Sequence, residues 1–343
     1  MANLQVTELD FDDIKENLKT FLKAQNKFKD YDFEGSGMNV LLDTLAYNTH
    51  YLAFNTNMAA NEMFLDSAAL RSSVVSHAKM LGYEVRSSRA PVANVNVIAT
   101  TSNDTLTMPA GTSFNATVGD NSYSFVTIED TTSSNSGGVI SFTNIPIYEG
   151  TYITASYTVD TSDATQRFLL TDERSDISTL SVQVQNSITD TQTTTFSKAT
   201  DITQLNSAST VYFCQEVEAG RFEIYFGDGI VSKALEDGNI ITLKYVVTNQ
   251  TEANGVESFT APSSIGGVTT ITVQTASRAL GGAEPESINS IKLAAPLDYA
   301  SQGRAVTTED YKIYTKRLFP NAQNVSGWGG ENGSFDPSLG VLA

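Results

Sequence analysis

The 343-residue sequence contains little cysteine or histidine and no long apolar run. Its one cysteine, Cys214, cannot form an internal disulfide or a cysteine-based zinc cluster. The two histidines, His50 and His77, fall in predicted helices and have no second ligand one turn away, so they predict no metal site. Because no stretch of about 18 apolar residues exists, no membrane span is predicted. The N-terminus is acidic and lacks the apolar segment of a secretory signal.

Positive charge is also scarce. The chain carries 21 Lys and Arg against 39 Asp and Glu, which gives a net charge of -18. Most of this acidity lies in residues 91–275. Phosphate binding needs clustered Lys and Arg, so nucleic acid and anionic membrane surfaces are excluded as partners. Hydrophobic residues make up 40%, which is enough to build a core. A chain kept in the cytosol, or a particle assembled there, fits this composition.

Catalytic motifs are missing as well. The sequence has no nucleophile elbow, no Walker loop and no dinucleotide-binding glycine pattern. Cys214 lies in a predicted strand without a nearby histidine and is interpreted as a core residue. The acidic group Asp172, Glu173 and Asp176 lacks the glycine turn of a calcium loop, which favours a solvated loop. Phe226–Gly229 spells FGDG and predicts a tight turn. We therefore predict no enzymatic activity, no metal and no cofactor.

Residues 1–90 carry helical patterns. From Phe11, apolar side chains recur at alternating steps of three and four residues, the spacing of a helix that packs against partner helices. About three heptads are marginal alone, so we predict that this seam packs against helices of other chains. The alternative is an amphipathic helix lying on its own domain. The predicted interchain seam consists of Phe11, Ile14, Leu18, Phe21, Leu22, Gln25 and Phe28, with Gln25 as its polar position.

Two more helices are predicted in this segment. One starts near Ser36 and runs past Leu52, with Met38, Leu41, Leu42 and Leu45 among its apolar residues. The next has Ser67 as its N-cap and ends at Gly82, which occupies the position where a glycine commonly terminates a helix.

Residues 91–275 have the pattern of a β domain. The segment from Pro91 to Thr100 alternates small or branched apolar residues with others, close to a period of two. Further short strands follow, separated by glycine-containing turns, which predicts a sandwich or a barrel-like domain. We expect this domain to be compact, so limited proteolysis should cut first near 86–91 and 276–284.

Residues 276–343 return to helical patterns. Pro285 suits the first position of a helix that ends before Pro296. Thr307 and Asp310 resemble a capping box at the start of a helix that stops before Pro320. The predicted fold is therefore α+β: an N-terminal helical segment (1–90), a central antiparallel β-rich domain (91–275) and a C-terminal α/β segment (276–343).

Four stretches resemble a known family, in the family's own order. They are the helical block from FKDYDFEGSG to GYEVRSSRAP, the strand and turn LTMPAGTSF, the segment FGDGIVSKAL, and the block from RALGGAEPES to SGWGGE. Together they resemble the baseplate J-like family of phage baseplate wedge proteins, in its T4-like branch. The chain resembles the N-terminal half of such a protein, with residues 276–343 starting a second family domain.

The resemblance implies a structural subunit of the contractile tail baseplate wedge. Such a subunit forms the inner ring around the hub and relays the trigger for sheath contraction. The implied partners are other wedge subunits through a helical core bundle, a second copy of the chain as a homodimer, and the sheath-initiating subunit. The implied location is the tail baseplate of the virion, assembled in the bacterial host cytoplasm.

Two other functions remain open from the residues. The Ser-, Thr- and Asn-rich β segment is compatible with a carbohydrate-binding or depolymerising tail protein. However, the single tryptophan, Trp328, lies outside that segment, and no carboxylate pair can be placed on it. The third possibility is a generic acidic binding module of the cytosol.

Overall fold

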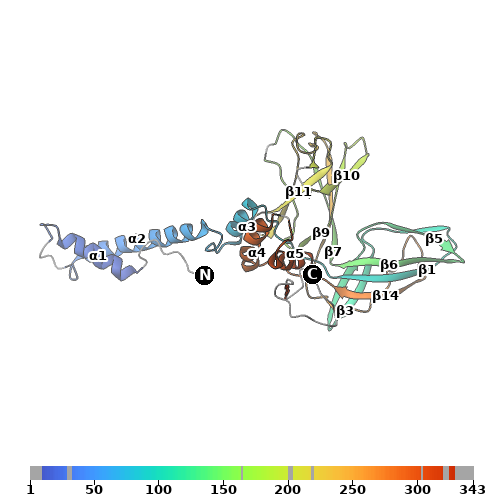
Figure 1. The fold of residues 1–343 in the computed structure, drawn as a ribbon, viewed down its shortest axis with the longest axis horizontal. Helices are drawn as coiled ribbons and strands as arrows, with labels where there is room; N and C mark the ends of the chain where they lie inside the picture. The colour runs from blue at the N-terminus through green and yellow to red at the C-terminus, as the bar shows by residue number, and fades with distance from the viewer. Residues whose placement is uncertain are drawn as a thin grey trace. The chain divides into compact units, whose positions relative to one another are not determined.

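The computed structural model describes residues 10–28, 33–163, 165–199, 204–217, 220–302, 304–319 and 324–328. The chain divides into two compact units (Figure 1). Unit 1 comprises residues 1–83 together with Ile288–Pro296. Unit 2 comprises Glu84–Ser287 and the residues from Leu297 onward. The fold is α+β, with helices at the N-terminal and C-terminal ends and antiparallel sheets between them, as predicted.

Unit 1 is helical. Its elements are α1 (Phe11–Lys23), α2 (Gly37–Glu62), α3 (Arg71–Met80) and the first part of α4 (Ile288–Ser301). The side chain of Asp10 caps α1 by accepting hydrogen bonds from the Asp12 and Asp13 N–H groups. The predicted seam extended to Phe28, but α1 ends at Lys23, so Gln25 and Phe28 lie in the turns that follow it. The intervening residues are polar and exposed, so no packed face holds them in the helix.

The third helix starts later than predicted. Its N-cap is Leu70, whereas the Ser67 hydroxyl donates to the Asn61 carbonyl oxygen at 2.6 Å. Its end matches the prediction. Gly82 has a φ of +77°, and the Gly82 and Tyr83 N–H groups bond to the Lys79 and Ala78 carbonyl oxygens. This is the Schellman arrangement, in which glycine tolerates the left-handed backbone conformation.

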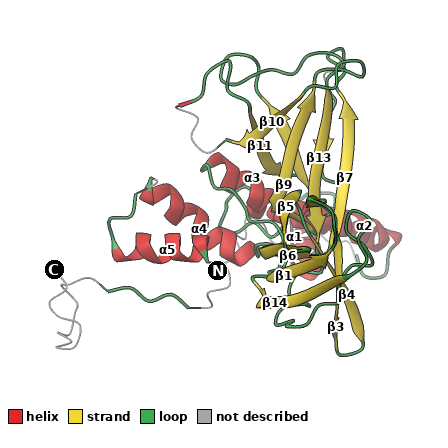
Figure 2. Cartoon of the chain, turned by 90° about the vertical axis from the view of Figure 1, so that its right-hand side faces the viewer, coloured by secondary structure: helices red, strands yellow, loops and turns green. Residues whose placement is uncertain are grey.

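Unit 2 contains two seven-stranded sheets (Figure 2). The first sheet has the order β14-β1-β6-β4-β3, with β5 pairing to both β6 and β2. Its strands are β1 (Val92–Thr100), β2 (Thr105–Met108), β3 (Ser113–Val118), β4 (Asn121–Val126), β5 (Thr131–Ser136), β6 (Val139–Glu149) and β14 (Ile271–Leu280).

The second sheet has the order β7-β13-β9-β10-β11-β12-β8. Its pairs are antiparallel except for the parallel pair β10–β11. Its strands are β7 (Thr151–Thr158), β8 (Phe168–Leu169), β9 (Ser175–Gln185), β10 (Thr193–Lys198), β11 (Val211–Glu216), β12 (Phe222–Phe226) and β13 (Ile240–Val247).

Each sheet has its own hydrophobic core, so the prediction of one sandwich or barrel was too simple. Val97, Phe114 and Phe142 belong to the core of the first sheet. Ile224 and Tyr245 belong to the core of the second. Only a small apolar cluster, including Val126 of β4 and Val246 of β13, contains residues from both sheets. The chain passes between them at Gly150, which separates β6 from β7.

The first strand follows its sequence pattern. Ala93, Val95, Val97 and Ala99 are fully buried, and the residues between them are half-buried. The long strand β6 was not predicted, because Asn144 and Pro146 interrupt its alternation. Asn144 has a φ of +54°, and its N–H donates to the Asn96 side chain at 2.8 Å. This irregularity coincides with a register shift against β1 and lets the strand continue.

The C-terminal helices differ from the prediction in one respect. Helix α4 starts at Ile288, later than Pro285 suggested, and continues through Pro296 to Ser301. Proline lacks the N–H for one helical bond, but the remaining bonds of the helix are unaffected. Helix α5 (Thr308–Leu318) begins with the predicted capping box, in which the Thr307 and Asp310 side chains each bond to the other's backbone N–H.

Candidate helical interface

Helices α1 and α2 of unit 1 pack against each other. The Lys15 ammonium lies 2.5 Å from the Asp43 carboxylate, and Lys19 pairs with Glu34. The hydrogen bond from Lys19 to Glu34 raises the pKa of the lysine. Ile14 is only 8% exposed, so this member of the predicted seam is already covered within the chain.

Helix α2 buries only a small part of its surface. Over 26 residues, the buried side chains are Leu42, Ala46, Ala53 and Asn57. These four lie on one face, because their spacings of four and seven residues match the helical repeat. The helix contains no Lys or Arg, and its acidic residues are Asp43 and Glu62. A long helix with so little charge is typical of a buried position.

Two apolar stripes remain exposed on α2. The first, here called the aromatic stripe, consists of Val40, Tyr47, Tyr51, Phe54 and Met58, which are 44 to 66% exposed. The rings of Tyr47 and Tyr51 stack with centroids 6.3 Å apart. The second, the leucine stripe, consists of Leu41, Leu45 and Leu52. At about 100° per residue, the two stripes and the buried face lie roughly 120° apart around the helix.

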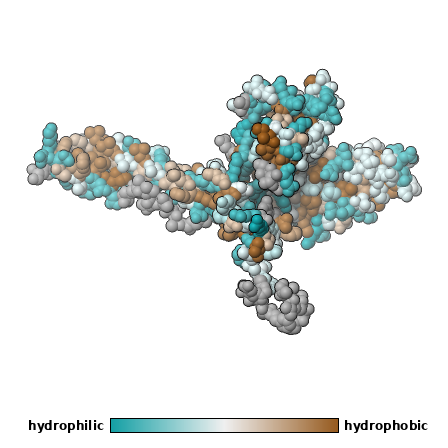
Figure 3. Space-filling view, turned by 45° about the horizontal axis from the view of Figure 1, so that its top comes forward, coloured by the Kyte–Doolittle hydropathy of each residue, from teal (hydrophilic) through white to brown (hydrophobic). Residues whose placement is uncertain are grey.

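The aromatic stripe has the spacing of a helical bundle seam. With Thr44 included, its residues follow at steps of four, three, four, three and four. Apolar surface is visible along the helical unit in Figure 3. Exposed apolar patches of this extent indicate a protein-binding surface. The sequence contained this second seam, but the stronger charge pattern around Phe11 drew attention to the shorter one on α1.

The predicted seam on α1 is divided by the structure. Ile14 is buried, whereas Phe11, Leu18, Leu22 and Phe28 are half-buried. Phe21 is 64% exposed, and Gln25 is exposed beyond the helix end. The interchain role of this seam remains a prediction, and Phe21 is the helical seam residue most available for it.

The rest of unit 1 is organised around Glu62. Its carboxylate accepts hydrogen bonds from the Ala69 and Leu70 N–H groups before α3. Partial burial opposes the charged form, but these bonds and one from Ser73 lower the pKa of Glu62. His77 lies 2.8 Å from the Glu62 carbonyl oxygen through Nε2, so this histidine has a structural contact.

The residues considered for chemistry in unit 2 have structural surroundings. Burial raises the pKa of the Cys214 thiol to about 12, which disfavours the reactive thiolate. Asp172 pairs with Arg174 at 3.1 Å, and Asp176 accepts from the Ala90 N–H at 2.8 Å. Among the residues with a described placement, no group of three His, Cys, Asp or Glu could hold a metal ion. In that part of the chain, no helix is both long and apolar enough to cross a membrane.

The FGDG segment forms the predicted turn. The Asp228 carboxylate accepts from the Ile230 N–H at 2.9 Å, and Gly229 has a φ of +86°. Gly227 is required by space, since a Cβ there would lie 1.9 Å from the Ser232 Oγ. The resemblance in this segment is therefore explained by turn geometry.

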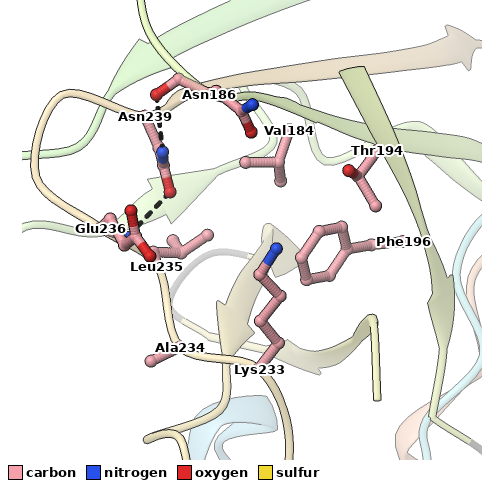
Figure 4. A pocket seen from close by; sticks show the side chains of 9 residues that line it. All are labelled: Val184, Asn186, Thr194, Phe196, Lys233, Ala234, Leu235, Glu236 and Asn239. Atoms are coloured by element: carbon pink, nitrogen blue, oxygen red, sulfur yellow. Dashed lines mark hydrogen bonds between the residues drawn. The ribbon is translucent and has the colours of Figure 1, made fainter. Parts of the chain in front are cut away.

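A small cavity lies beside this loop (Figure 4). Its volume is about 50 Å³, well below the roughly 300 Å³ at which ligand pockets begin. The Asn239 side chain bonds to the Asn186 carbonyl and to the Glu236 N–H, both at 2.8 Å. The lining also includes Lys233 and Phe196. A sugar ring does not fit a space of this size, so this cavity does not support the carbohydrate-binding alternative.

Comparison with known families identifies both the helical unit and the second sheet. Residues 10–83 match the helical domain of "Baseplate wedge protein gp6-like", and residues 156–254 match the third domain of "Bacteriophage baseplate wedge protein gp6". The two matches together cover about half of the chain. The chain belongs to the gp6-like family of phage baseplate wedge proteins.

A curated relative supports this assignment. The gp6-like chain is 30% identical over 336 residues to the baseplate wedge protein gp6 of Enterobacteria phage T4. The alignment covers 90% of this chain and 50% of the T4 protein, so the chain spans half the length of this relative. As a gp6-like protein, the chain is a structural component of the virion's tail baseplate.

A solved structure also matches the gp6-like chain. It is the cryo-EM structure of the anti-feeding prophage (AFP) baseplate, 6-fold symmetrised, with a TM-score of 0.35 and 13% sequence identity. The match covers 92% of this chain and 66% of that chain. At this TM-score the likeness carries no argument about the fold.

Proposed function

We propose that the chain is a non-enzymatic wedge subunit whose helices α1 and α2 join a bundle with helices of neighbouring wedge subunits. The two exposed stripes of α2 carry this proposal. Each of their eight side chains is about half exposed, and covering one contributes roughly 1 kcal/mol. A helix with apolar surface on three faces requires more than the one partner that α1 provides.

The family resemblance extends this proposal to the particle. The partners would be other wedge subunits, a second copy of the chain and the sheath-initiating subunit, in an inner ring around the hub that relays the contraction trigger. The predicted segments 1–90, 91–275 and 276–343 would then divide the work, with the first supplying the bundle. The absence of a catalytic role rests on the structural surroundings of Cys214 and of the acidic residues described above.

The experiment compares substitutions on the stripes with one between them. Leu45→Asp and Phe54→Asp each place a charge on an exposed apolar position, and Asn55→Asp places the same charge on an exposed polar position of the same helix. Each variant is co-expressed with the other wedge subunits of the same phage and recovered by affinity purification. The melting temperature of each isolated variant is measured in parallel.

We expect the isolated variants to melt like the unmodified chain, because the substituted positions are already exposed. The two stripe variants should fail to join the wedge complex, and Asn55→Asp should join it. Leu18→Asp tests the shorter seam on α1 in the same assay. If the stripe variants assemble normally, the bundle proposal is wrong. If they lose assembly only in proportion to lost stability, the stripes serve the chain's own fold.

A further inference from the structure

The second sheet ends in a strand whose outer edge is unprotected. Strand β7 pairs with β13 along its whole length, from Val247 opposite Thr151 to Ile240 opposite Thr158, without a register shift. Figure 2 shows β7 at the edge of its sheet. Within the described part of the chain, Thr151–Thr158 form no backbone hydrogen bond on the side away from β13.

The orientation of the free groups follows from one contact. The Thr158 carbonyl accepts from the Gln166 side chain at 2.7 Å, whereas Val159 bonds to Asn239 and Gly238 next to β13. In an antiparallel strand, the N–H and C=O of one residue point to the same side and alternate along the chain. Ser156 and Thr154 therefore direct their backbone groups to the open side.

The other exposed strand edges in the described sheets are protected. Beside β3, the Thr260 N–H donates to the Asn115 carbonyl at 2.7 Å. Strand β14 is covered near Ala279 by bonds to Gly255 and Val256, and its register against β1 is irregular. Strands β2 and β8 are short, at four and two residues. Natural proteins protect edges by these devices and by Lys, Pro or bulges, none of which occurs in β7.

The inner face of β7 is also incompletely covered. Ile153, Ala155 and Tyr157 pack against the core of the second sheet but remain half-buried. Tyr157 makes an edge contact with the Phe168 ring, with centroids 5.7 Å apart. An added strand would extend the sheet and cover these side chains. The edge therefore offers both backbone hydrogen bonds and apolar surface to a partner.

We propose that β7 pairs antiparallel with β7 of a second copy of this chain, which joins the two second sheets into one continuous sheet. The argument for a second copy is self-complementarity. Residues 150–159 contain no charge, although the chain as a whole has a net charge of -18. Two copies can therefore pair here without placing like charges opposite each other. In such a two-fold arrangement, each inner-face residue meets another residue of the same small set.

This proposal does not rest on the helical bundle, and its test removes the bundle surface first. All measurements use the full chain carrying Leu45→Asp and Phe54→Asp, which silences the stripes of α2. In this background, sedimentation velocity over a range of protein concentrations measures the dimer. Added salt should strengthen dimerisation, because it screens the repulsion between two acidic chains.

The first comparison is a charge exchange. Thr154→Lys with Ser156→Lys places positive charges across the proposed interface and should weaken dimerisation about tenfold or more. Thr154→Glu with Ser156→Glu should do the same, and mixing the two variants should restore dimers. The control, Thr193→Lys with Thr195→Lys, adds the same charge to exposed positions of β10, which lies inside the sheet. It should leave dimerisation unchanged.

The second comparison uses disulfide capture in a Cys214→Ala background. Single cysteines are placed at Thr154, Ala155 or Ser156, because a two-fold axis brings the central residue within reach of its own copy. One of the three should cross-link under mild oxidation, and Thr195→Cys should not. A chain that is monomeric at all concentrations and salt levels overturns the proposal. A dimer unaffected by the Lys variants, or not restored by mixing, also overturns it.

Discussion

Arg86 and Glu286 form an ion pair across 200 residues of sequence, with Nη2 and Oε1 3.2 Å apart. The Arg86 N–H donates to the other carboxylate oxygen at 3.3 Å, and the Glu286 N–H donates to the Arg86 carbonyl at 3.1 Å. The Glu286 side chain is fully buried. These bonds hold the two ends of the β region together before and after its strands. A nearby bridge between Arg89 and Ala283 continues the same pairing.

This clasp changes the expectation for limited proteolysis. The sequence predicted early cleavage near 86–91 and 276–284. Those segments are paired with each other, and Ser88 and Ala90 are buried. A protease needs an exposed and extended segment. We therefore expect these borders to resist cleavage as long as unit 2 is folded.

The first prediction concerns the clasp itself. Arg86→Ala leaves the buried Glu286 carboxylate without its guanidinium partner and should lower the free energy of unfolding by about 2 kcal/mol. Adding Glu286→Gln should recover part of this loss, because a neutral amide is easier to bury than an unpaired carboxylate. Denaturant unfolding of the two single variants and the double variant measures the coupling. Additive losses would show that the ion pair does not contribute.

The second prediction concerns the passage between the two sheets at Gly150. This residue has a φ of +127°, and a Cβ here would lie 2.2 Å from the Val247 carbonyl oxygen. Gly150→Ala should therefore destabilise the fold by about 3 kcal/mol or more, through both backbone strain and collision. The matched control is Gly137→Ala, where φ is +66° but nothing lies within 4 Å. Its cost should be about 1 kcal/mol, from the backbone conformation alone. Thermal unfolding of both variants distinguishes the two contributions, and equal losses would contradict the packing argument.

The third prediction is a pH dependence at the start of α5. Hydrogen bonds from the Thr307 and Val306 N–H groups lower the pKa of Asp310. A carboxylate whose pKa is lower in the folded state stabilises that state above its unfolded pKa. This contribution is lost as the pH falls through the folded pKa. Asp310→Asn should weaken α5 at neutral pH and make little difference in strong acid. Amide hydrogen exchange of α5 as a function of pH measures this, and an unchanged profile would contradict the prediction.

Local features could be predicted because neighbouring residues decide them. The alternation of β1, the turn at Gly82 and the capping box at Thr307 each depend on residues a few positions apart. The FGDG turn follows the same rule, since Asp228 and Gly229 bond within the loop. The family could be identified from the sequence as well, because its motifs occur in order along the chain.

Other features depend on the tertiary structure. The division of the β region into two cores depends on which distant strands pair, and β6 continues only because Asn96 binds the irregular backbone at Asn144. The predicted seam on α1 was interpreted from spacing alone. Yet burial of Ile14 and exposure of Phe21 depend on where α2 packs.

The sequence by itself therefore determined the helical and strand patterns, the caps and turns, and the family. The tertiary structure decided which apolar faces are already covered and which strand edge is left open. The physical reason is that a pattern of apolar residues specifies that a face must be buried. It does not specify whether the covering surface comes from the same chain or from another.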